Sequence, residues 1–248
     1  MDARPLAGKV ALVTGAGIRL GRAIALALGR AGADVAVHFH SSGEAARETA
    51  AALGGLGVRS TLVQADQADP GEVRRMFGEV DAALGGLDVL VNSAGILERR
   101  YLEDIDDAAW RRMIDIDLSG PFYACREAAP RFDRRGGGAI VNVVDVAVEL
   151  PWPAHAHYCA AKAGLAGLTR QLAVELAPRN IRVNGVAPGA VLVPADYDEA
   201  KRARIVARVP MKREGSPEDV ADTVVFLAAG PSYLTGQIVA VDGGRSLV

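Results

Sequence analysis

Cysteine and net charge are both scarce in this sequence. Cys125 and Cys159 are the only cysteines among 248 residues, and the formal net charge is −2. Two cysteines exclude a disulfide framework or a cysteine-based metal centre, and they fit a reducing compartment. A charge so near zero offers nucleic acid no basic surface. Because no apolar run could cross a bilayer and no leader pattern is present, we predict a cytoplasmic protein without metal, nucleic-acid or membrane partners.

Aromatic residues are also few, at 5%, although half of the residues are hydrophobic. This composition predicts a large aliphatic core. Short apolar runs rich in β-branched residues alternate with longer stretches of helical pattern. The expected strands are 9–13, 34–39, 60–64, 87–91, 139–144, 181–187 and 237–241. The expected helices are about 20–31, 43–56, 70–85, 106–134, 155–177 and 217–229.

Strict alternation of such strands and helices predicts right-handed crossovers and a parallel sheet. We therefore predict an α/β fold, a single Rossmann-type doubly wound parallel sheet flanked by helices on both faces. No linker or repeat divides the chain, so residues 1–248 are expected to form one domain. The irregular, charged segment at about 193–213 is expected to be a lid over the substrate.

A glycine-rich turn follows the first expected strand. It reads Thr14-Gly15-Ala16-Gly17-Ile18-Arg19-Leu20-Gly21 and leads into a helix. Such a turn places backbone N–H groups and a helix N-terminus against a pyrophosphate. We predict that Gly15, Arg19, Leu20 and Gly21 bind a dinucleotide. A tight turn without a ligand is the alternative.

No acidic residue ends the second expected strand, where an NAD site would place one for the ribose hydroxyls. The chain there reads His38-Phe39-His40-Ser41-Ser42. A guanidinium from Arg19, the imidazole of His40 and the hydroxyls of Ser41 and Ser42 suit a 2′-phosphate instead. The predicted cofactor is therefore NADP(H), although each of these residues taken alone could be an ordinary loop residue.

Tyr158 and Lys162 are four residues apart in an expected helix. This spacing puts a phenol and an ammonium group on one helix face. A nearby positive charge favours the phenolate and lowers the pKa of a tyrosine, which prepares it for proton transfer. We predict that the pair lies at a catalytic centre.

With these motifs together, the chain resembles the short-chain dehydrogenase/reductase family over nearly its whole length. The matching residues run from the turn at Thr14 to Val241-Asp242-Gly243-Gly244, and include Arg182-Val183-Asn184. The resemblance implies that Tyr158 is the acid/base and that Lys162 binds the nicotinamide ribose. It also implies cofactor contacts after the third, fourth and sixth strands, from Asp66, Asn92, Ala94, Gly95, Pro188 and Gly189.

Two departures from the family pattern point to one branch. Most members have glycine where this chain has Arg19, and a catalytic serine thirteen residues before the tyrosine, where this chain has Asp145. Both changes, with the His-x-His-x-Ser run at 38–42, are similar to pteridine reductases. A carboxyl suits that chemistry because it binds ring nitrogens and passes a proton through Tyr158. Local packing or capping by Asp145 is the alternative.

Other departures do not follow that branch. The aromatic residue expected after the Asn-x-Ala turn is replaced by Ile96, so Trp152 or Tyr197 would have to supply an aromatic wall. The family's catalytic asparagine is Asp117, which keeps a backbone carbonyl for the proton relay but adds a charge near Lys162. His157 is expected at the surface of a helix start.

Three functions remain open at this point. The first is reduction of a C=N bond in a pterin-like ring, and the second is reduction of a carbonyl, for example in a 3-oxoacyl thioester. The third is a non-catalytic NADP(H) sensor, which the intact pair Tyr158 and Lys162 argues against. The resemblance further implies a small-molecule substrate and a homotetramer, with interfaces on the helices at 106–134 and 155–177 and on the last helix–strand pair.

Overall fold

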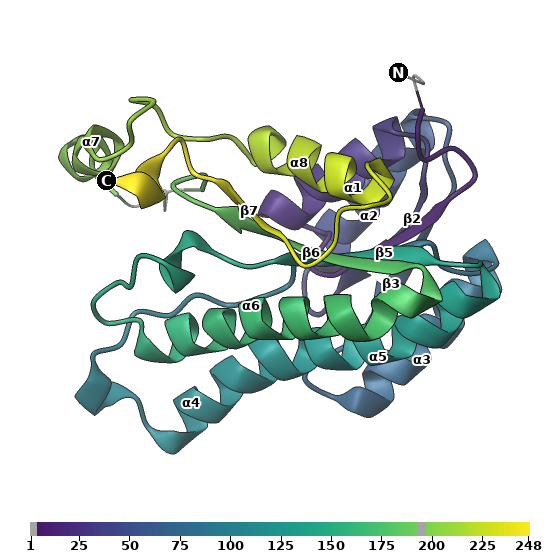
Figure 1. Ribbon diagram of the computed structural model, residues 1–248, viewed down its shortest axis with the longest axis horizontal. Helices are drawn as coiled ribbons and strands as arrows, with labels where there is room; N and C mark the ends of the chain where they lie inside the picture. Colours follow the sequence, from purple (N-terminus) through teal and green to yellow (C-terminus); the bar gives the residue numbers. More distant parts are fainter. Residues whose placement is uncertain (1–3, 193–196) are drawn as a thin grey trace.

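The computed structural model describes residues 4–192 and 197–248. Within them, seven parallel strands form one sheet in the order β3-β2-β1-β4-β5-β6-β7 (Figure 1). The strands are β1 Val10–Val13, β2 Asp34–Phe39, β3 Ser60–Gln64, β4 Val89–Asn92, β5 Gly138–Val143, β6 Ile181–Pro188 and β7 Ile238–Val241. The predicted doubly wound parallel sheet is confirmed.

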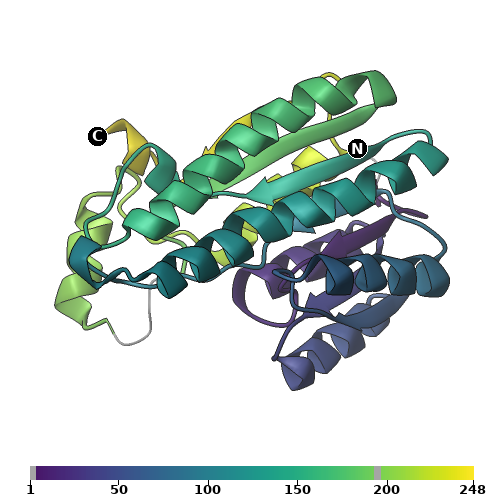
Figure 2. The same cartoon turned by 90° about the horizontal axis from the view of Figure 1, so that it is seen from below.

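Helices cover both faces of this sheet. They are α1 Arg19–Arg30, α2 Gly43–Gly55, α3 Pro70–Leu84, α4 Asp107–Ile114, α5 Gly120–Arg134, α6 Ala156–Leu176, α7 Glu199–Ala207 and α8 Pro217–Ala229. Helices α1, α2 and α8 lie on one face, and α3, α5 and α6 lie on the other (Figure 1). Figure 2 shows the long helices α5 and α6 side by side across the second face. No helix in the described part of the chain is long and apolar enough to span a membrane.

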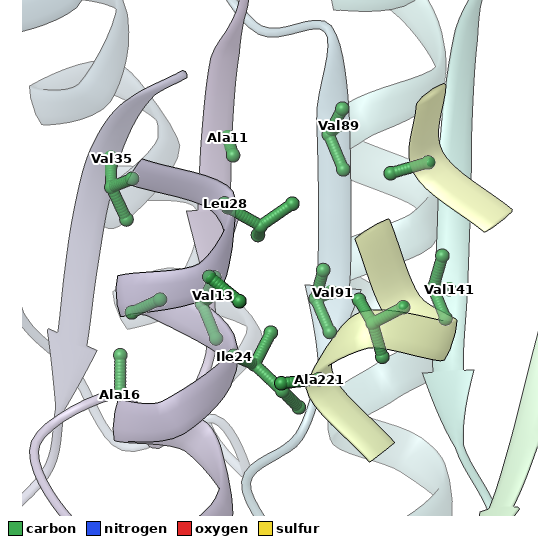
Figure 3. Close-up of a cluster of buried hydrophobic side chains, with 14 of the residues drawn as sticks. Ala11, Val13, Ala16, Ile24, Leu28, Val35, Val89, Val91, Val141 and Ala221 are labelled. Carbon is green, nitrogen blue, oxygen red and sulfur yellow. The ribbon is translucent and has the colours of Figure 1, made fainter. Parts of the chain in front are cut away.

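The core is split by the sheet into two aliphatic layers. In β1, Ala11 and Val13 face α1 and α8 (Figure 3), while Val10 and Leu12 face α3 and α5. The alternation follows from the two-residue period of a strand, and both faces are apolar because both are covered. The same pattern recurs in β2, β4 and β5, so the sheet is anchored on both sides where it carries the site.

The starts of two helices show how the sequence sets their ends. Asp69 accepts hydrogen bonds from the backbone N–H groups at the start of α3, which has Pro70 in its first turn. Ser216 and Asp219 form a reciprocal capping box at the start of α8, which has Pro217 in its first turn. Both patterns are common helix-start signals. The predicted helix at 217–229 is confirmed to the residue.

The direction in which successive strands are added to the sheet reverses between β1 and β4, which are parallel neighbours. Successive connections run outward from β1 toward β3 and from β4 toward β7. In such sheets, a crevice forms at this point beyond the carboxyl ends of the strands. The loops at 14–18, 93–101, 144–155 and 189–192 all leave the sheet at that edge.

One predicted element is divided in the structure. The expected helix at 106–134 is α4 and α5 joined by a π-helical turn, Asp115–Ser119. Such turns insert one extra residue into a helix and often occur at functional sites. This one carries Asp117. Sequence periodicity missed it because the helical apolar pattern continues across the turn.

Candidate active site

The glycine-rich loop between β1 and α1 is shaped by close backbone approaches. A Cβ atom on Gly21 would collide with the carbonyl oxygen of Gly15, and a Cβ on Gly15 would lie 2.9 Å from the Cα of Ala94. Gly15 also has a φ of +66°, which side chains disfavour. Glycine is required here because the loop must lie against both α1 and the turn after β4.

The start of α1 is open to an anion. Its N-cap residue, Ile18, makes no side-chain cap hydrogen bond, and no acidic residue lies in the first turn. The partial positive charge of the helix N-terminus is therefore left for a ligand. These features fit the pyrophosphate of the predicted dinucleotide, with Leu20 and Gly21 in the first turn of the helix.

His38 holds the glycine-rich loop through hydrogen bonds of its imidazole ring, a role that the sequence analysis did not predict. The backbone N–H of Gly15 donates to His38 Nδ1 at 3.0 Å, and His38 Nε2 lies 3.0 Å from the carbonyl oxygen of Ala65. Burial lowers the pKa of His38 to about 4, so the ring is neutral and donates from Nε2. The side chain ties the glycine-rich loop to the end of β3.

The predicted 2′-phosphate residues are not all gathered in one place: His40, Ser41 and Ser42 lie at the end of β2, whereas the guanidinium of Arg19 contacts the loop after β6. His40 and Ser41 are exposed, and Ser42 lies against Gly17, where a Cβ would be 2.8 Å from the Ser42 hydroxyl oxygen. Arg19 is exposed and donates to the carbonyl oxygen of Leu192 at 3.4 Å. Its φ of 51° is a left-handed conformation that glycine adopts at least cost.

The turns after β3 and β4 hold the other predicted cofactor residues. Asp66 is partly exposed, and its carboxylate accepts from the backbone N–H of Ala68. Thr14 Oγ1 accepts from the backbone N–H groups of Ser93 and Ala94 at 2.9 and 3.0 Å. The turn at 92–95 is therefore fixed to the glycine-rich loop, with Gly95 at its exposed end.

Asn92 is placed differently from the rest of its turn. Its side chain is buried and donates to Asn142 Oδ1 at 2.8 Å, and Asn142 donates to Thr169 Oγ1 at 2.9 Å. This chain of amides connects β4, β5 and α6. A contact between Asn92 and the cofactor would therefore have to come from its backbone.

The Pro-Gly loop at the end of β6 packs on the end of the chain. A Cβ on Gly189 would lie 2.6 Å from the Cβ of Asp242. The Asp242 carboxylate accepts from the backbone N–H groups of Gly244 and Ser246 at 2.9 and 2.6 Å. The terminal Asp-Gly-Gly run therefore holds Pro188 and Gly189 at the carboxyl edge of the sheet.

Tyr158 and Lys162 lie one turn apart in α6, and both are 6% exposed. The Tyr158 hydroxyl donates to Asp145 Oδ2 at 2.7 Å. Lys162 Nζ donates to the carbonyl oxygen of Val143 at 3.1 Å and lies 3.3 Å from Asp117 Oδ2. The four predicted catalytic residues are therefore gathered in one cluster.

Asp145 is held rigidly in this cluster. It caps a short 3₁₀ turn, Val146–Val148, and its Oδ1 accepts from the backbone N–H of Ala147 at 2.8 Å. Burial raises the pKa of Asp145, while its hydrogen bonds and the charge of Lys162 oppose the rise. The capping role given as an alternative is real, but it leaves Oδ2 directed at Tyr158.

The expected lowering of the Tyr158 pKa is wrong for this arrangement. Burial, followed by the adjacent Asp145 carboxylate, raises the pKa of Tyr158 well above its usual value. Lys162 Nζ lies 5.8 Å from the centre of the Tyr158 ring and is held by Val143 and Asp117. The negative charge in direct contact with the phenol outweighs the more distant positive charge.

The surroundings of Tyr158 include an aromatic wall. Trp152 stacks beside Tyr158, with ring centroids 6.3 Å apart and planes at 18°, and Ile96 packs against the same cluster. Tyr197 instead lies under the ammonium of Lys201 in the lid region, 3.2 Å from the ring centre. Of the two aromatic residues proposed from the sequence, only Trp152 lies beside Tyr158 in the described part of the chain.

The predicted lid is only partly described. Residues 193–196 lie outside the described residues, and α7 forms in the remainder of the 193–213 segment. Asp198 caps α7 by accepting from the backbone N–H of Lys201 at 2.7 Å. The segment therefore contains a capped helix, while its role as a lid stays a prediction.

Comparison with known proteins places this geometry in a family. Residues 15–246 match the family model described as enoyl-(acyl carrier protein) reductase. The chain is 42% identical over 240 residues to 3-oxoacyl-[acyl-carrier-protein] reductase FabG of Staphylococcus aureus, covering 95% of this chain and 97% of that protein. It is 40% identical to 3beta-hydroxysteroid dehydrogenase 1 of Eggerthella lenta, covering 98% of this chain and 95% of that protein.

A solved structure agrees with these relatives. A protein described as a short-chain alcohol dehydrogenase from Sinorhizobium meliloti 1021 superposes with a TM-score of 0.94, at 36% identity and 98% coverage of both chains. This chain belongs to the short-chain dehydrogenase/reductase family. It is an oxidoreductase of the kind that uses a nicotinamide cofactor. The resemblance to the pteridine reductase branch is not among these findings and stays a prediction.

Within this short-chain dehydrogenase/reductase, the Arg-Val-Asn run has a structural role. Arg182 donates to the carbonyl oxygens of Leu227 and Ala228 at 2.7 and 2.8 Å, which caps the end of α8. Asn184 bonds both Leu234 and Gln237 in the loop before β7. The run therefore positions β6 and β7, and with them the Pro-Gly loop.

Proposed function

We propose that this protein is an NADPH-dependent carbonyl reductase that acts on a 3-oxoacyl thioester or a related ketone. The nearly full-length similarity to a 3-oxoacyl-[acyl-carrier-protein] reductase supports this substrate class. The observation that carries the reaction type is the 2.7 Å hydrogen bond between Tyr158 and Asp145, beside Lys162. This cluster can deliver a proton to a carbonyl oxygen.

The chemistry is divided between cofactor and protein. The nicotinamide, when bound, supplies a hydride to the carbonyl carbon. Tyr158 then donates its phenolic proton to the oxygen, and the ammonium of Lys162 stabilises the phenolate that remains. Asp145, where most family members have serine, receives the Tyr158 hydrogen bond and fixes the direction of the hydroxyl.

The choice of NADPH rests on the end of β2. His40 and Ser41 are exposed there, and Ser42 lies beside the glycine-rich loop that carries Arg19. Because this edge has an imidazole and two hydroxyl groups and no carboxylate at the strand end, and because the exposed Arg19 could turn toward it from the adjacent loop, it favours a phosphate over free ribose hydroxyls.

A pterin-like C=N substrate is the second candidate, and two observations favour it. Asp145 offers a carboxyl that can accept from ring N–H and exocyclic amine groups, which a serine hydroxyl does less well. Trp152 provides a flat aromatic surface beside Tyr158, on which a bicyclic ring could stack.

One substrate panel separates these candidates. NADPH oxidation would be measured for the wild type and Asp145→Ser with acetoacetyl thioesters, diketones and dihydrobiopterin. For a carbonyl reductase, we expect wild-type turnover of the thioester, and turnover of equal or greater rate in Asp145→Ser. Turnover of dihydropterin alone, abolished in Asp145→Ser, would support the second candidate. Tight NADPH binding without any turnover would indicate a sensor.

The same variant tests the protonation state of Asp145. Its pKa is raised by burial, so the carboxyl is neutral to a higher pH than usual and ionises as the pH rises through that value. The ionised form retains the Tyr158 proton and opposes negative charge on the carbonyl oxygen. Carbonyl reduction should therefore fall as the pH rises through the Asp145 pKa, and Asp145→Ser should lose this part of the pH profile.

We also propose a homotetramer. Large apolar side chains are exposed on the faces named from the sequence, with Trp110 in α4, Phe122 in α5 and Val174 in α6. Phe226 in α8 is exposed near the last strand. Such side chains commonly mark contacts between subunits. Light scattering at micromolar concentration should give four times the chain mass, and a monomeric mass would contradict the proposal.

A further inference from the structure

Two of the buried polar side chains take no part in the reaction described above. His157 is 0% exposed, so its expected surface position is wrong, and its ring makes no hydrogen bond to the described residues. Gln67 is 6% exposed and makes two hydrogen bonds, both to backbone carbonyl oxygens of other segments. Buried hydrogen bonds that join separate segments make their relative positions more rigid. Gln67 is therefore a side chain that can position the segments around it.

The amide of Gln67 lies between two parts of the site. Its Nε2 donates to the carbonyl oxygen of Ala94 at 3.2 Å and to that of Ile116 at 2.8 Å. Ala94 belongs to the turn after β4 that holds predicted cofactor contacts, and Ile116 belongs to the π-helical turn that carries Asp117. One amide NH₂ group has two hydrogens, so it can serve both oxygens at once. The side chain thus joins the turn after β4 to the π-helical turn.

The π-helical turn explains why the Ile116 carbonyl oxygen needs this partner. The backbone N–H of Gly120 donates to the carbonyl oxygen of Asp115, five residues earlier. The next residue is Pro121, which has no N–H. The Ile116 carbonyl is therefore left without a donor from the helix that follows, and a carbonyl removed from water requires one. Gln67 supplies the missing hydrogen bond.

Gln67 is held closely at both ends of its side chain. A Cβ on Gly120, the first residue of α5, would lie 2.9 Å from Gln67 Cγ and 3.0 Å from the Gln67 carbonyl oxygen. The absence of a side chain at Gly120 thus lets Gln67 lie directly on the start of α5. The turn that carries Gln67 is fixed by Asp66, whose carbonyl oxygen accepts from the backbone N–H of Asp69 at 3.1 Å. The Asp66 carboxylate also accepts from the backbone N–H of Ala68 at 2.9 Å.

Asp117 is the residue that this contact places. The Ile116 carbonyl and the Asp117 N–H belong to one planar peptide group, so Gln67 holds the peptide from which Asp117 begins. Asp117 Oδ1 accepts from the backbone N–H of Ile96 at 2.9 Å, and Asp117 Oδ2 lies 3.3 Å from Lys162 Nζ. A shift of the π-helical turn would therefore change the distance between Asp117 and Lys162.

We propose that Gln67 is a positioning residue that couples the predicted cofactor contacts after β3 and β4 to the turn that carries Asp117. This proposal rests on the NADPH-dependent function above. Asp66, which precedes Gln67, and Ala94, one of its two partners, are both predicted to contact the cofactor. Bound NADPH restrains these residues and, through the Gln67 amide, restrains the Ile116 carbonyl. The occupied site therefore holds Asp117 more firmly than the empty site does.

Hydrogen exchange measured by mass spectrometry tests the coupling without any substrate. Exchange would be followed in the glycine-rich loop and in residues 113–120, with and without NADPH, in the wild type and in Gln67→Met. Methionine has nearly the length and volume of glutamine and cannot donate. We expect NADPH to slow exchange in both segments of the wild type, but only in the glycine-rich loop of Gln67→Met. Equal slowing at 113–120 in both proteins would overturn the coupling.

Failure of the proposed function would look different. If NADPH slowed exchange in neither segment of the wild type, the cofactor assignment would be wrong, and the coupling would be wrong with it. If both segments responded as expected while the substrate panel gave no turnover, the coupling would be supported and the reductase function contradicted.

Turnover separates the hydrogen bonds of Gln67 from its packing. In Gln67→Met, kcat should fall roughly tenfold, the scale of one buried hydrogen bond, while KM for the carbonyl substrate stays the same. Gln67→Glu keeps the shape of the side chain but sets an acceptor against two other acceptors, so it should be slower than Gln67→Met. A role in packing alone predicts the opposite order, with Gln67→Glu close to the wild type, and that order would overturn the proposal.

Pro121→Ala offers a rescue of the unpaired carbonyl. It supplies an N–H that can donate to the Ile116 carbonyl oxygen across the π-helical turn in place of Gln67. Added to Gln67→Met, it should restore part of kcat. It should not restore the response of residues 113–120 to NADPH, because the link to Ala94 stays broken. A double variant no faster than Gln67→Met would overturn the role of the Ile116 carbonyl.

Gln64→Met is the matched control. Gln64 also donates from Nε2 to a backbone carbonyl oxygen, that of His40 at 2.9 Å, but it is exposed, and its amide bonds the end of β2 instead of the π-helical turn. It should keep the wild-type kcat and the wild-type response of residues 113–120 to NADPH. A loss of either as large as in Gln67→Met would mean that the effect is not specific to the contacts of Gln67, and the assignment would fail.

Discussion

The two ends of the site are built in different ways. Around the glycine-rich loop, Gly15 and Gly21 have no side chains, and this allows neighbouring backbone segments to pack in direct contact. Around α6, positions are set by two polar pairs, in which Tyr158 donates to Asp145 and Lys162 lies against Asp117. Substitutions should therefore act through steric collision around the glycine-rich loop, which we call the cofactor end of the site. They should act through altered charge around α6, which we call the proposed catalytic end.

The family departures follow the same division. Arg19 replaces glycine on the exposed side of the cofactor end, where its charge is solvated. Asp145 and Asp117 place carboxyl groups inside the catalytic end, where burial raises the pKa of both. A charge in water costs little, whereas a buried charge must be paired or neutralised. The departures that change the chemistry of the site are therefore the two carboxyl groups at the proposed catalytic end, Asp145 and Asp117.

The largest effect is expected from Tyr158→Phe. Removing the phenolic hydroxyl takes away the proton donor, and turnover should fall roughly 10²–10⁴-fold. NADPH should still bind, because the glycine-rich loop is untouched, and a fluorescence titration would check this. Retained turnover would mean that Asp145 protonates the substrate directly. The buried carboxyl groups of Asp145 and Asp117 would then contribute more to proton transfer than the phenol does.

Gly21→Ala tests whether steric collision disrupts the glycine-rich loop at the cofactor end of the site. Its new methyl group would meet the carbonyl oxygen of Gly15, so α1 must move away from the loop. We expect a loss of about 3 kcal/mol in unfolding free energy, at the upper end for overpacking. Urea denaturation would measure it, and cofactor affinity should weaken in parallel.

Gly78→Ala is the matched control for this collision. Gly78 lies inside α3, and a Cβ there meets nothing within 4 Å. Alanine should stabilise the helix by up to about 1 kcal/mol. An equal loss of stability in both variants would show that backbone contact is not what requires glycine at position 21.

Much of this division can be seen in the sequence. Glycines are specified by local turn geometry, so the cofactor loop could be predicted from spacing alone, and so could the face shared by Tyr158 and Lys162. The π-helical turn at Asp117 could not, because helical periodicity runs through it. Nor could the role of His38, since its partners Gly15 and Ala65 come together only when β2 is paired in the sheet.

The pKa direction of Tyr158 was also beyond sequence reasoning. The spacing to Lys162 is fixed by the helix, but the approach of Asp145 depends on how the loop after β5 folds back. Likewise, the burial of His157 depends on the loop after β4, which is distant in sequence. Where a group's environment comes from another segment of the chain, residue spacing does not determine its charge.

A smaller effect is expected from Arg19→Gly. One charge-assisted contact to the 2′-phosphate is worth roughly 1.5–3 kcal/mol, so NADPH should lose about 10- to 100-fold in affinity while NADH changes little. Glycine also suits the φ of 51° at this position, so stability should not fall with affinity. Equal dissociation constants for NADPH and NADH in the wild type would reject the phosphate site.

The smallest effect is expected at Ala154, just before α6. Like Arg19 it has a left-handed backbone, with φ of 62°, and its carbonyl oxygen accepts from the backbone N–H of Arg100 at 2.9 Å. A left-handed alanine costs roughly 1–2 kcal/mol, while glycine adds about 0.4–1 kcal/mol of entropy to the unfolded chain. Ala154→Gly should therefore gain at most about 1.5 kcal/mol in unfolding free energy.

Asn180→Gly makes this last comparison sharper. Asn180 also has a left-handed backbone, with φ of 56°, but it lies far from the catalytic cluster, and asparagine tolerates that conformation. Its side chain also donates to the carbonyl oxygen of Gly136, so glycine should bring no gain there. A gain at Ala154 alone would mean that the catalytic end carries backbone strain as well as buried charge. If Ala154→Gly also lowers kcat, then the strain helps to hold the loops that flank Tyr158, which is a role that solvated Arg19 cannot have at the cofactor end.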